Sequence, residues 1–203
     1  AANNKQHDLL QDVLRQLPFI KKILPVVPLL PYYIDANSVT RDWDGKSADD
    51  PEFRFAYYGL NDEIAQFYGL KMKEGPASFE LGRGEIFINE TMAKKLNMQN
   101  PIGKTILYNF NKNRSIIKGI VSDFQVQNPR TEPLPFVYAR YRPLRTEFDG
   151  MIVNLDRHVA FKYEGDWEAC RKILEEQLLE REVKNISFAD GEKHYDYFLK
   201  SEY

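Results

Sequence analysis

The sequence predicts an α+β fold in which a strand-rich middle is inserted between two ends that hold both helices and strands. Near both ends, apolar residues recur every three or four positions, which is the spacing of an amphipathic helix. Between them lie short runs in which apolar and polar residues alternate, as strands require. Hydrophobic residues make up 43% of the 203 residues, so the chain can bury a core.

The first expected element is a helix over residues 5–24. Its apolar stripe consists of Leu9, Leu10, Val13, Leu14 and Leu17. Pro18 falls inside this window and is expected to end or kink the helix. Pro25, Pro28 and Pro31 then force an extended chain, which would suit either a polyproline ligand or an edge or buried strand. The apolar residues between these prolines favour the strand.

Residues 35–52 are rich in Asp, Asn, Ser and Gly and predict an exposed loop. The spacing of its four aspartates, Asp42, Asp44, Asp49 and Asp50, does not match an EF-hand, so we expect them to be solvated. Alternation at Phe53, Phe55 and Tyr57 predicts a strand. A short helix is expected to follow, capped by Asn61 and stopped by Gly69.

The middle of the chain predicts a strand over residues 85–88, followed by a helix that Asn89 caps. Asn97 is expected to end this helix in the left-handed conformation. Gly103 permits a tight turn into a strand with Ile106, Tyr108 and Phe110 on one face. A hairpin-type turn over residues 111–114 then leads to a partner strand over residues 115–121.

The last third predicts strands over residues 136–141, 151–155 and 159–163. Asp166 is expected to cap a helix whose buried face holds Trp167, Cys170, Leu174 and Leu178. A short strand over residues 185–188 and a last helix from Gly191 complete the expected order.

Composition and charge exclude several classes of function. Twenty-eight basic and 30 acidic residues give a net charge of −2, and no basic stripe is present, so we expect no nucleic-acid partner. Cys170 is the one cysteine, which excludes an intrachain disulfide and a multi-cysteine zinc site. The longest apolar run, residues 23–34, is too short to span a bilayer and is broken by proline. Both ends read as helices cut from a longer polypeptide, so we expect membrane segments outside this chain.

No pattern of reactive side chains predicts catalysis. The chain has no phosphate-binding loop and no Gly-x-Ser-x-Gly elbow. Its histidines, His7, His158 and His194, are scattered and are expected to be solvated, and Cys170 is expected to be a buried, inert thiol. Asp123 is an acid at the end of a strand, for which a turn-forming role is favoured over a functional one. We expect no catalytic residue, no cofactor and no metal.

Three motifs in the middle third nevertheless form a signature. They are Asn89-Glu90-Thr91-x-Ala93-Lys94-Lys95-Leu96, Asn100-Pro101-Ile102-Gly103-Lys104 and Gly119-Ile120-Val121-x-Asp123-Phe124. In this order and spacing they resemble the periplasmic core domain of MacB/FtsX-type ABC transporter permeases. Weaker similarity extends to both ends. Pro76 and Asn97 depart from the family, which commonly has Arg and Gly there.

The resemblance implies a domain on the periplasmic side of the bacterial inner membrane, between the first two membrane helices of a permease. It implies a porter-like subdomain from residues 1–80 and 150–203, and an inserted sabre-like subdomain from residues 81–149. It also implies that the domain transmits ATP-driven motion of its own membrane helices to a substrate or a partner. The implied partners are a cytoplasmic ATPase, a second permease in a dimer and a periplasmic protein.

Two other functions remain open at this point. A ligand-sensing domain, or one that regulates a cell-wall hydrolase, would share the extracytoplasmic location, and sensing would need a partly apolar pocket with a few converging polar groups. A soluble hydrolase has no support in the residues, and analogy of fold would not supply it.

Overall fold

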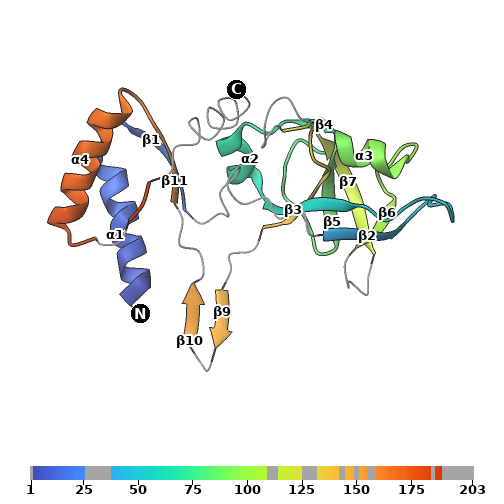
Figure 1. The fold of residues 1–203 in the computed structure, drawn as a ribbon, viewed down its shortest axis with the longest axis horizontal. Helices are drawn as coiled ribbons and strands as arrows, with labels where there is room; N and C mark the ends of the chain where they lie inside the picture. Colours follow the sequence, from blue (N-terminus) through green and yellow to red (C-terminus); the bar gives the residue numbers. More distant parts are fainter. Residues whose placement is uncertain are drawn as a thin grey trace, which may run out of the picture. The chain divides into compact units, whose positions relative to one another are not determined.

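The computed structural model describes residues 2–25, 38–108, 114–124, 132–141, 145–148, 151–154, 159–183 and 186–188 (Figure 1). The chain divides into two compact units, and each is considered by itself. Unit 1 comprises Ala1–Leu30 and Pro143–Gly191, and unit 2 comprises Pro31–Arg142 and Glu192–Tyr203. The fold is therefore mixed α+β, with the middle of the chain forming its own unit.

This division differs from the expected subdomains, 1–80 plus 150–203 and 81–149. Residues 38–80 belong with the middle of the chain because three of their strands share one sheet with the strands over residues 85–140. Main-chain pairing between distant segments sets this boundary, so amino-acid composition along the chain does not predict it.

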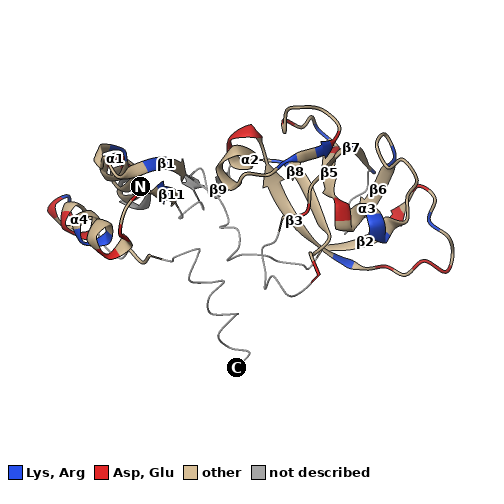
Figure 2. Ribbon diagram, turned by 90° about the horizontal axis from the view of Figure 1, so that it is seen from above, with Lys and Arg blue, Asp and Glu red and all other residues tan. Residues whose placement is uncertain are grey.

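Unit 1 packs two helices with a two-stranded antiparallel sheet. The helices are α1 (Ala2–Gln16) and α4 (Trp167–Glu180), and the strands are β1 (Ile20–Pro25) and β11 (Val159–Tyr163). Its core comprises Val13, Leu14, Leu17, Leu174, Leu178 and Val183. Figure 2 shows acidic and basic residues interspersed along α4, as on a solvated helix face.

The expectation that Pro18 ends or kinks the first helix is confirmed. Helix α1 stops at Gln16, inside the 5–24 window, because Pro18 cannot continue a helix, and the chain re-enters regular structure as β1. The prediction that Asp166 caps a helix is confirmed, since its side chain accepts a hydrogen bond from Ala169 N at 3.0 Å.

Two further strands form a hairpin, β9 (Arg145–Phe148) paired with β10 (Met151–Asn154). The strand expected over residues 151–155 is thus confirmed as β10, while β9 was not predicted. Residues 186–188 carry no strand, so that expectation is wrong for them. The last helix, most of the Pro25–Pro31 segment and the turn at residues 111–113 lie outside the described residues.

Unit 2 is built on a seven-stranded mixed sheet in the order β4-β7-β5-β8-β3-β2-β6. Its strands are β2 (Ser38–Trp43), β3 (Arg54–Leu60), β4 (Met72–Glu74), β5 (Glu85–Asn89), β6 (Thr105–Tyr108), β7 (Ser115–Val121) and β8 (Phe136–Arg140). Strand β7 also pairs with β6, so six of the strands close into a barrel and β4 extends it beside the end of β7. Closure satisfies edges that would otherwise expose unpaired backbone groups.

One core cluster in unit 2 joins strands of this barrel to helix α3 (Glu90–Leu96). It comprises Trp43, Phe55, Ile86, Ile88, Met92, Leu96, Ile106, Tyr108, Ile117, Ile120, Val137 and Ala139. The alternate residues of β3, β5 and β8 are also buried, including Tyr58, Phe87 and Tyr138. Burial on both faces explains the long apolar runs of these strands.

The prediction of an exposed loop over residues 35–52 is wrong for its first described part. Residues 38–43 form β2, which pairs with β3 and β6. Thr40 is fully buried, and its hydroxyl oxygen accepts a hydrogen bond from Phe53 N at 3.0 Å. Tertiary pairing here overrides a composition typical of loops.

The predicted caps of both short helices are confirmed. The Asn61 side chain accepts from Ile64 N at the start of α2 (Asp62–Tyr68), and Gly69 ends that helix with φ of 72°. Asn89 caps α3 in the same way, and Asn97 ends it with φ of 49°. The two asparagine caps therefore follow the same local rule but sit in different surroundings.

Candidate functional site

Asn89 is the centre of the signature. It is fully buried where β5 ends and α3 begins. Its amide nitrogen donates to Asp123 Oδ1 at 2.6 Å and to Leu134 O at 2.8 Å. Its amide oxygen accepts from Met92 N at 2.9 Å and Phe136 N at 2.7 Å. All four hydrogen-bonding positions of the side chain are used, which is the full capacity of an asparagine.

Asp123 follows β7 and closes this cluster from a second element. Its carboxylate accepts from Thr91 N at 3.0 Å and from the Thr91 hydroxyl at 2.8 Å, in addition to the Asn89 amide. Its position at a strand end is as predicted. Its partners, however, lie more than 30 residues earlier in the sequence, so Asp123 joins distant elements and does not shape a local turn.

Glu90 extends the cluster to β4. Its carboxylate accepts from Asp123 N at 3.1 Å and forms an ion pair with Lys73. The Lys73 side chain lowers the pKa of Glu90, with a further contribution from the Asp123 amide. The structure therefore brings together four predicted signature residues, Asn89, Glu90, Thr91 and Asp123.

The turn Pro101–Lys104 lies in the same unit but contacts β7 nearer its start. Gly103 has φ of 85°, and its amide donates to Ile117 O at 2.8 Å. Ile117 N in turn donates to Lys104 O at 2.9 Å. Pro101 is buried, whereas Ile102 is 42% exposed. This part of the signature positions β6 against β7.

The third motif holds β7 between its neighbours. A Cβ atom on Gly119 would lie 2.6 Å from Glu74 O, so only glycine allows β4 to approach this closely. Val121 is fully buried, and the Phe124 ring lies edge-on to Tyr68 with centroids 6.3 Å apart. Every signature residue with a described contact thus takes part in packing or backbone organisation.

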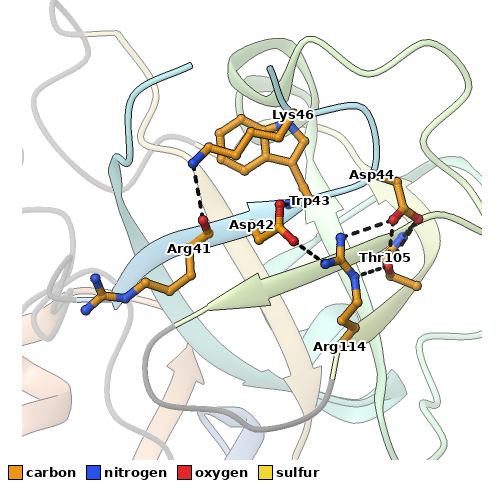
Figure 3. A network of polar contacts seen from close by, with 7 residues as sticks. All are labelled: Arg41, Asp42, Trp43, Asp44, Lys46, Thr105 and Arg114. Atoms are coloured by element: carbon orange, nitrogen blue, oxygen red, sulfur yellow. Dashed lines mark hydrogen bonds and ion pairs between the residues drawn. The ribbon is translucent and has the colours of Figure 1, made fainter. Parts of the chain in front are cut away.

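A second polar network was not predicted and centres on Arg114 (Figure 3). The guanidinium contacts Asp42 at 2.5 Å, Asp44 at 3.1 Å and the Thr105 hydroxyl at 2.6 Å. Asp44 also accepts from Thr105 N at 2.7 Å. The network ties the ends of β2, β6 and β7 together. Asp42 and Asp44, expected to be solvated, are ion-paired, and only the spatial closure of the barrel reveals this.

These contacts lower the pKa of both aspartates. For Asp42 the hydrogen bond from Arg114 is the main cause, and for Asp44 it is the hydrogen bond from the Thr105 amide. Nearby, Lys46 Nζ lies 5.2 Å from the Trp43 ring centroid and donates to Arg41 O at 3.3 Å. The arrangement is a charged brace on the surface of the barrel.

The remaining candidate groups are placed as follows. Cys170 is buried, as predicted, with its sulfur 3.6 Å from Glu164 O. His7 Nδ1 lies 3.0 Å from the Gln11 amide nitrogen, and His158 and His194 fall outside the described residues. Within the described part of the chain, no three His, Cys, Asp or Glu residues are grouped so that they could hold a metal ion.

None of the helices over the described residues is long and apolar enough to cross a membrane.

Comparison with known proteins gives a likeness of fold. No protein-family model matches the chain, and no curated protein matches its sequence. A crystal structure of "a domain of a putative Permease protein" from Porphyromonas gingivalis matches over 84% of this chain and 74% of that chain. The identity is 14% and the TM-score is 0.53. The two domains therefore share a fold.

Proposed function

We propose that this chain is the extracytoplasmic domain of a bacterial ABC transporter permease subunit. In this role it carries no reaction of its own and needs no cofactor. It transmits the ATP-driven motion of membrane helices to a substrate or to a partner on the outer side of the inner membrane.

The fold likeness over 84% of the chain to a domain described as part of a permease is the observation that carries this proposal. The three-motif resemblance to MacB/FtsX-type permeases points the same way and rests on the sequence alone. The polar residues of the signature also support it, because the side chains of Asn89, Thr91 and Asp123 form hydrogen bonds with one another and with the backbone. Such residues suit a part that must hold its shape under load.

The proposed partners follow from this setting. They are the protein's own membrane helices, a cytoplasmic ATPase and a second permease copy, with a periplasmic protein as the receiver of the motion. The mixed charge of the chain, −2 overall, fits protein partners better than nucleic acid.

The location is tested with reporter fusions in the full-length gene product. Alkaline phosphatase, which becomes active outside the cytoplasm, is joined in the loop after Trp43, and a cytoplasm-active fluorescent protein is joined there in a parallel strain. We expect phosphatase activity without fluorescence. Fluorescence without phosphatase activity would overturn the extracytoplasmic assignment.

Transmission is tested in the reconstituted transporter with two spin labels, one in each unit. Leu179 in unit 1 and Ile102 in unit 2 are suitable positions because they are 77% and 42% exposed. We expect the distance between the labels, or between copies, to change on ATP addition and to stay constant with a hydrolysis-deficient ATPase. If ATP leaves the distances unchanged with the active ATPase as well as with the hydrolysis-deficient one, a sensing or hydrolase-regulating domain would be favoured instead.

A further inference from the structure

We propose that Asn89 is a coupling clasp: its side chain joins the first turn of α3 to two other segments, Asp123 after β7 and residues 134–136 at the start of β8. This coupling does not depend on the membrane setting of the chain, so it stands or falls separately from the proposed function.

The clasp holds three segments with one side chain. After β7, the Asn89 amide nitrogen donates to Asp123 Oδ1 at 2.6 Å. At the start of β8, it donates to Leu134 O at 2.8 Å, and its oxygen accepts from Phe136 N at 2.7 Å. In the helix, the same oxygen accepts from Met92 N at 2.9 Å. Met92 and Phe136 therefore share one acceptor atom, and Asp123 and Leu134 share one donor atom.

Burial makes these bonds interdependent. Asn89 has no exposed surface, so water cannot replace a bond that breaks there. A shift of Leu134 or Phe136 must either carry the Asn89 amide with it or leave buried groups unpaired. Because the amide is planar and rigid, its movement also shifts the acceptor that caps α3.

The two segments are anchored differently. Asp123 has further links to α3, since it accepts from Thr91 and its amide donates to Glu90 Oε2 at 3.1 Å. Residues 134–136 are also held to β3, where Ala56 N donates to Pro135 O at 2.9 Å, and β8 packs directly against α3. To that packing Asn89 adds a direct hydrogen-bonded link between residues 134–136 and the start of the helix.

A matched control exists in the same unit. Asn61 caps α2 with the same geometry, accepting from Ile64 N at 2.8 Å, and is only partly buried. Asn61→Ala therefore removes only a helix cap. Asn89→Ala removes a helix cap together with the hydrogen bonds to Asp123, Leu134 and Phe136.

Hydrogen exchange of individual amides, measured by NMR on the whole chain, tests the coupling. In Asn89→Ala the amides of Met92 and Phe136 lose their acceptor directly, so the coupling is measured at Thr91 and Ala56, whose acceptors are Asp123 Oδ1 and Pro135 O. We expect exchange at both to accelerate by about tenfold relative to Asn61→Ala, in which only amides at the start of α2 respond. Faster exchange confined to Met92 and Phe136 would show that Asn89 makes independent hydrogen bonds and would overturn the proposal.

Two milder variants keep the test decisive if Asn89→Ala does not fold. Asn89→Asp retains an acceptor for Met92 and Phe136, loses the amide donors and places a second carboxyl against Asp123. Two carboxylates this close disfavour double ionisation, so the stability lost relative to wild type should shrink as pH falls from 7 to 4. A loss independent of pH would contradict the Asn89–Asp123 link.

Thr91→Val removes one hydroxyl bond to Asp123 and leaves the Asn89 amide intact. We expect the exchange of Asp123 to rise severalfold while that of Phe136 stays at the wild-type rate. An equal rise at both amides would show general loosening of the unit and would contradict a specific path through Asn89.

Discussion

Individual buried polar side chains organise the barrel at points where segments distant in the sequence meet. Asn89 and Thr40 are fully buried, and each bonds to backbone groups of another segment. Such bonds add little net stability when made but cost roughly 1–3 kcal/mol when a buried partner is left unpaired. These residues therefore select one arrangement of the strands over its alternatives.

The Arg114 brace should give the protein a stability that depends on pH. The folded-state pKa values of Asp42 and Asp44 lie below their usual values, so the contribution is complete above the unfolded pKa and is lost as pH falls through the folded one. The three side chains are 35–49% exposed, so solvent screening limits the effect to about 1 kcal/mol. We expect Arg114→Gln to lower the free energy of urea unfolding by that amount at pH 7 and by less at pH 3.

Arg41→Gln is the control for this prediction. Arg41 lies in β2, as Asp42 does, and its substitution removes an exposed ion pair with Glu52. The Arg114 brace stays in place. The cost of Arg41→Gln at pH 7 should be smaller, and high salt should reduce both losses. If the Arg114→Gln deficit is the same at pH 3 and pH 7, the ion pairs are not its source.

At the scale of secondary structure, glycine decides how closely β4 approaches β7. Gly75 and Gly119 face each other, and a Cβ on Gly75 would lie 2.8 Å from Gly119 Cα. Strand β4 has three residues and a register shift, so it was not recognised in the sequence. Its pairing depends on the absence of two side chains more than on any residue it carries.

Gly119→Ala should therefore displace β4 and destabilise unit 2 by about 1–3 kcal/mol, because the new methyl group meets backbone atoms. Gly82→Ala is the matched control. Its Cβ would meet only the end of the flexible Glu85 side chain, at 2.9 Å. Thermal unfolding should show a clear loss for Gly119→Ala and a small one for Gly82→Ala. Equal losses would mean that close backbone approach is not the constraint at Gly119.

At the scale of the whole molecule, each of the two units has a core cluster of its own among the described residues. The unit 1 core joins α1 and α4 over the β1–β11 pair, and the core cluster of unit 2 joins the barrel strands to α3. Each contains side chains with no exposed surface, such as Leu14 in unit 1 and Ile88 in unit 2. Separate cores predict separate responses to core substitutions.

Leu14→Ala should cost unit 1 roughly 2–4 kcal/mol through the lost burial and the cavity left behind. Hydrogen exchange followed by mass spectrometry should show faster exchange in peptides from α1, β1, β11 and α4. Peptides from β5, β7 and β8 should keep wild-type rates, and Ile88→Ala should give the reverse pattern. Uniform acceleration across both units would show that they unfold as one cooperative body.

The sequence by itself determined the elements whose cause is local. The N-caps at Asn61, Asn89 and Asp166 and the left-handed residue at Asn97 follow from side-chain and backbone geometry within one turn. The mixed α+β class and the position of Asp123 just after a strand also follow from the local alternation of apolar and polar residues. Pro18 marked the true end of α1, although the apolar periodicity ran past it.

Only the tertiary structure decided which distant segments meet. It turned residues 38–43 from an expected loop into β2, moved residues 38–80 into the barrel unit, and brought Asp42 and Asp44 to Arg114. It also gave Asn89 its further partners, Asp123 and Leu134, on two segments far from it in the sequence. These outcomes depend on long-range strand pairing and closure of the sheet. The groups that stabilise this pairing lie far apart in the chain, so they produce no periodic pattern in the sequence.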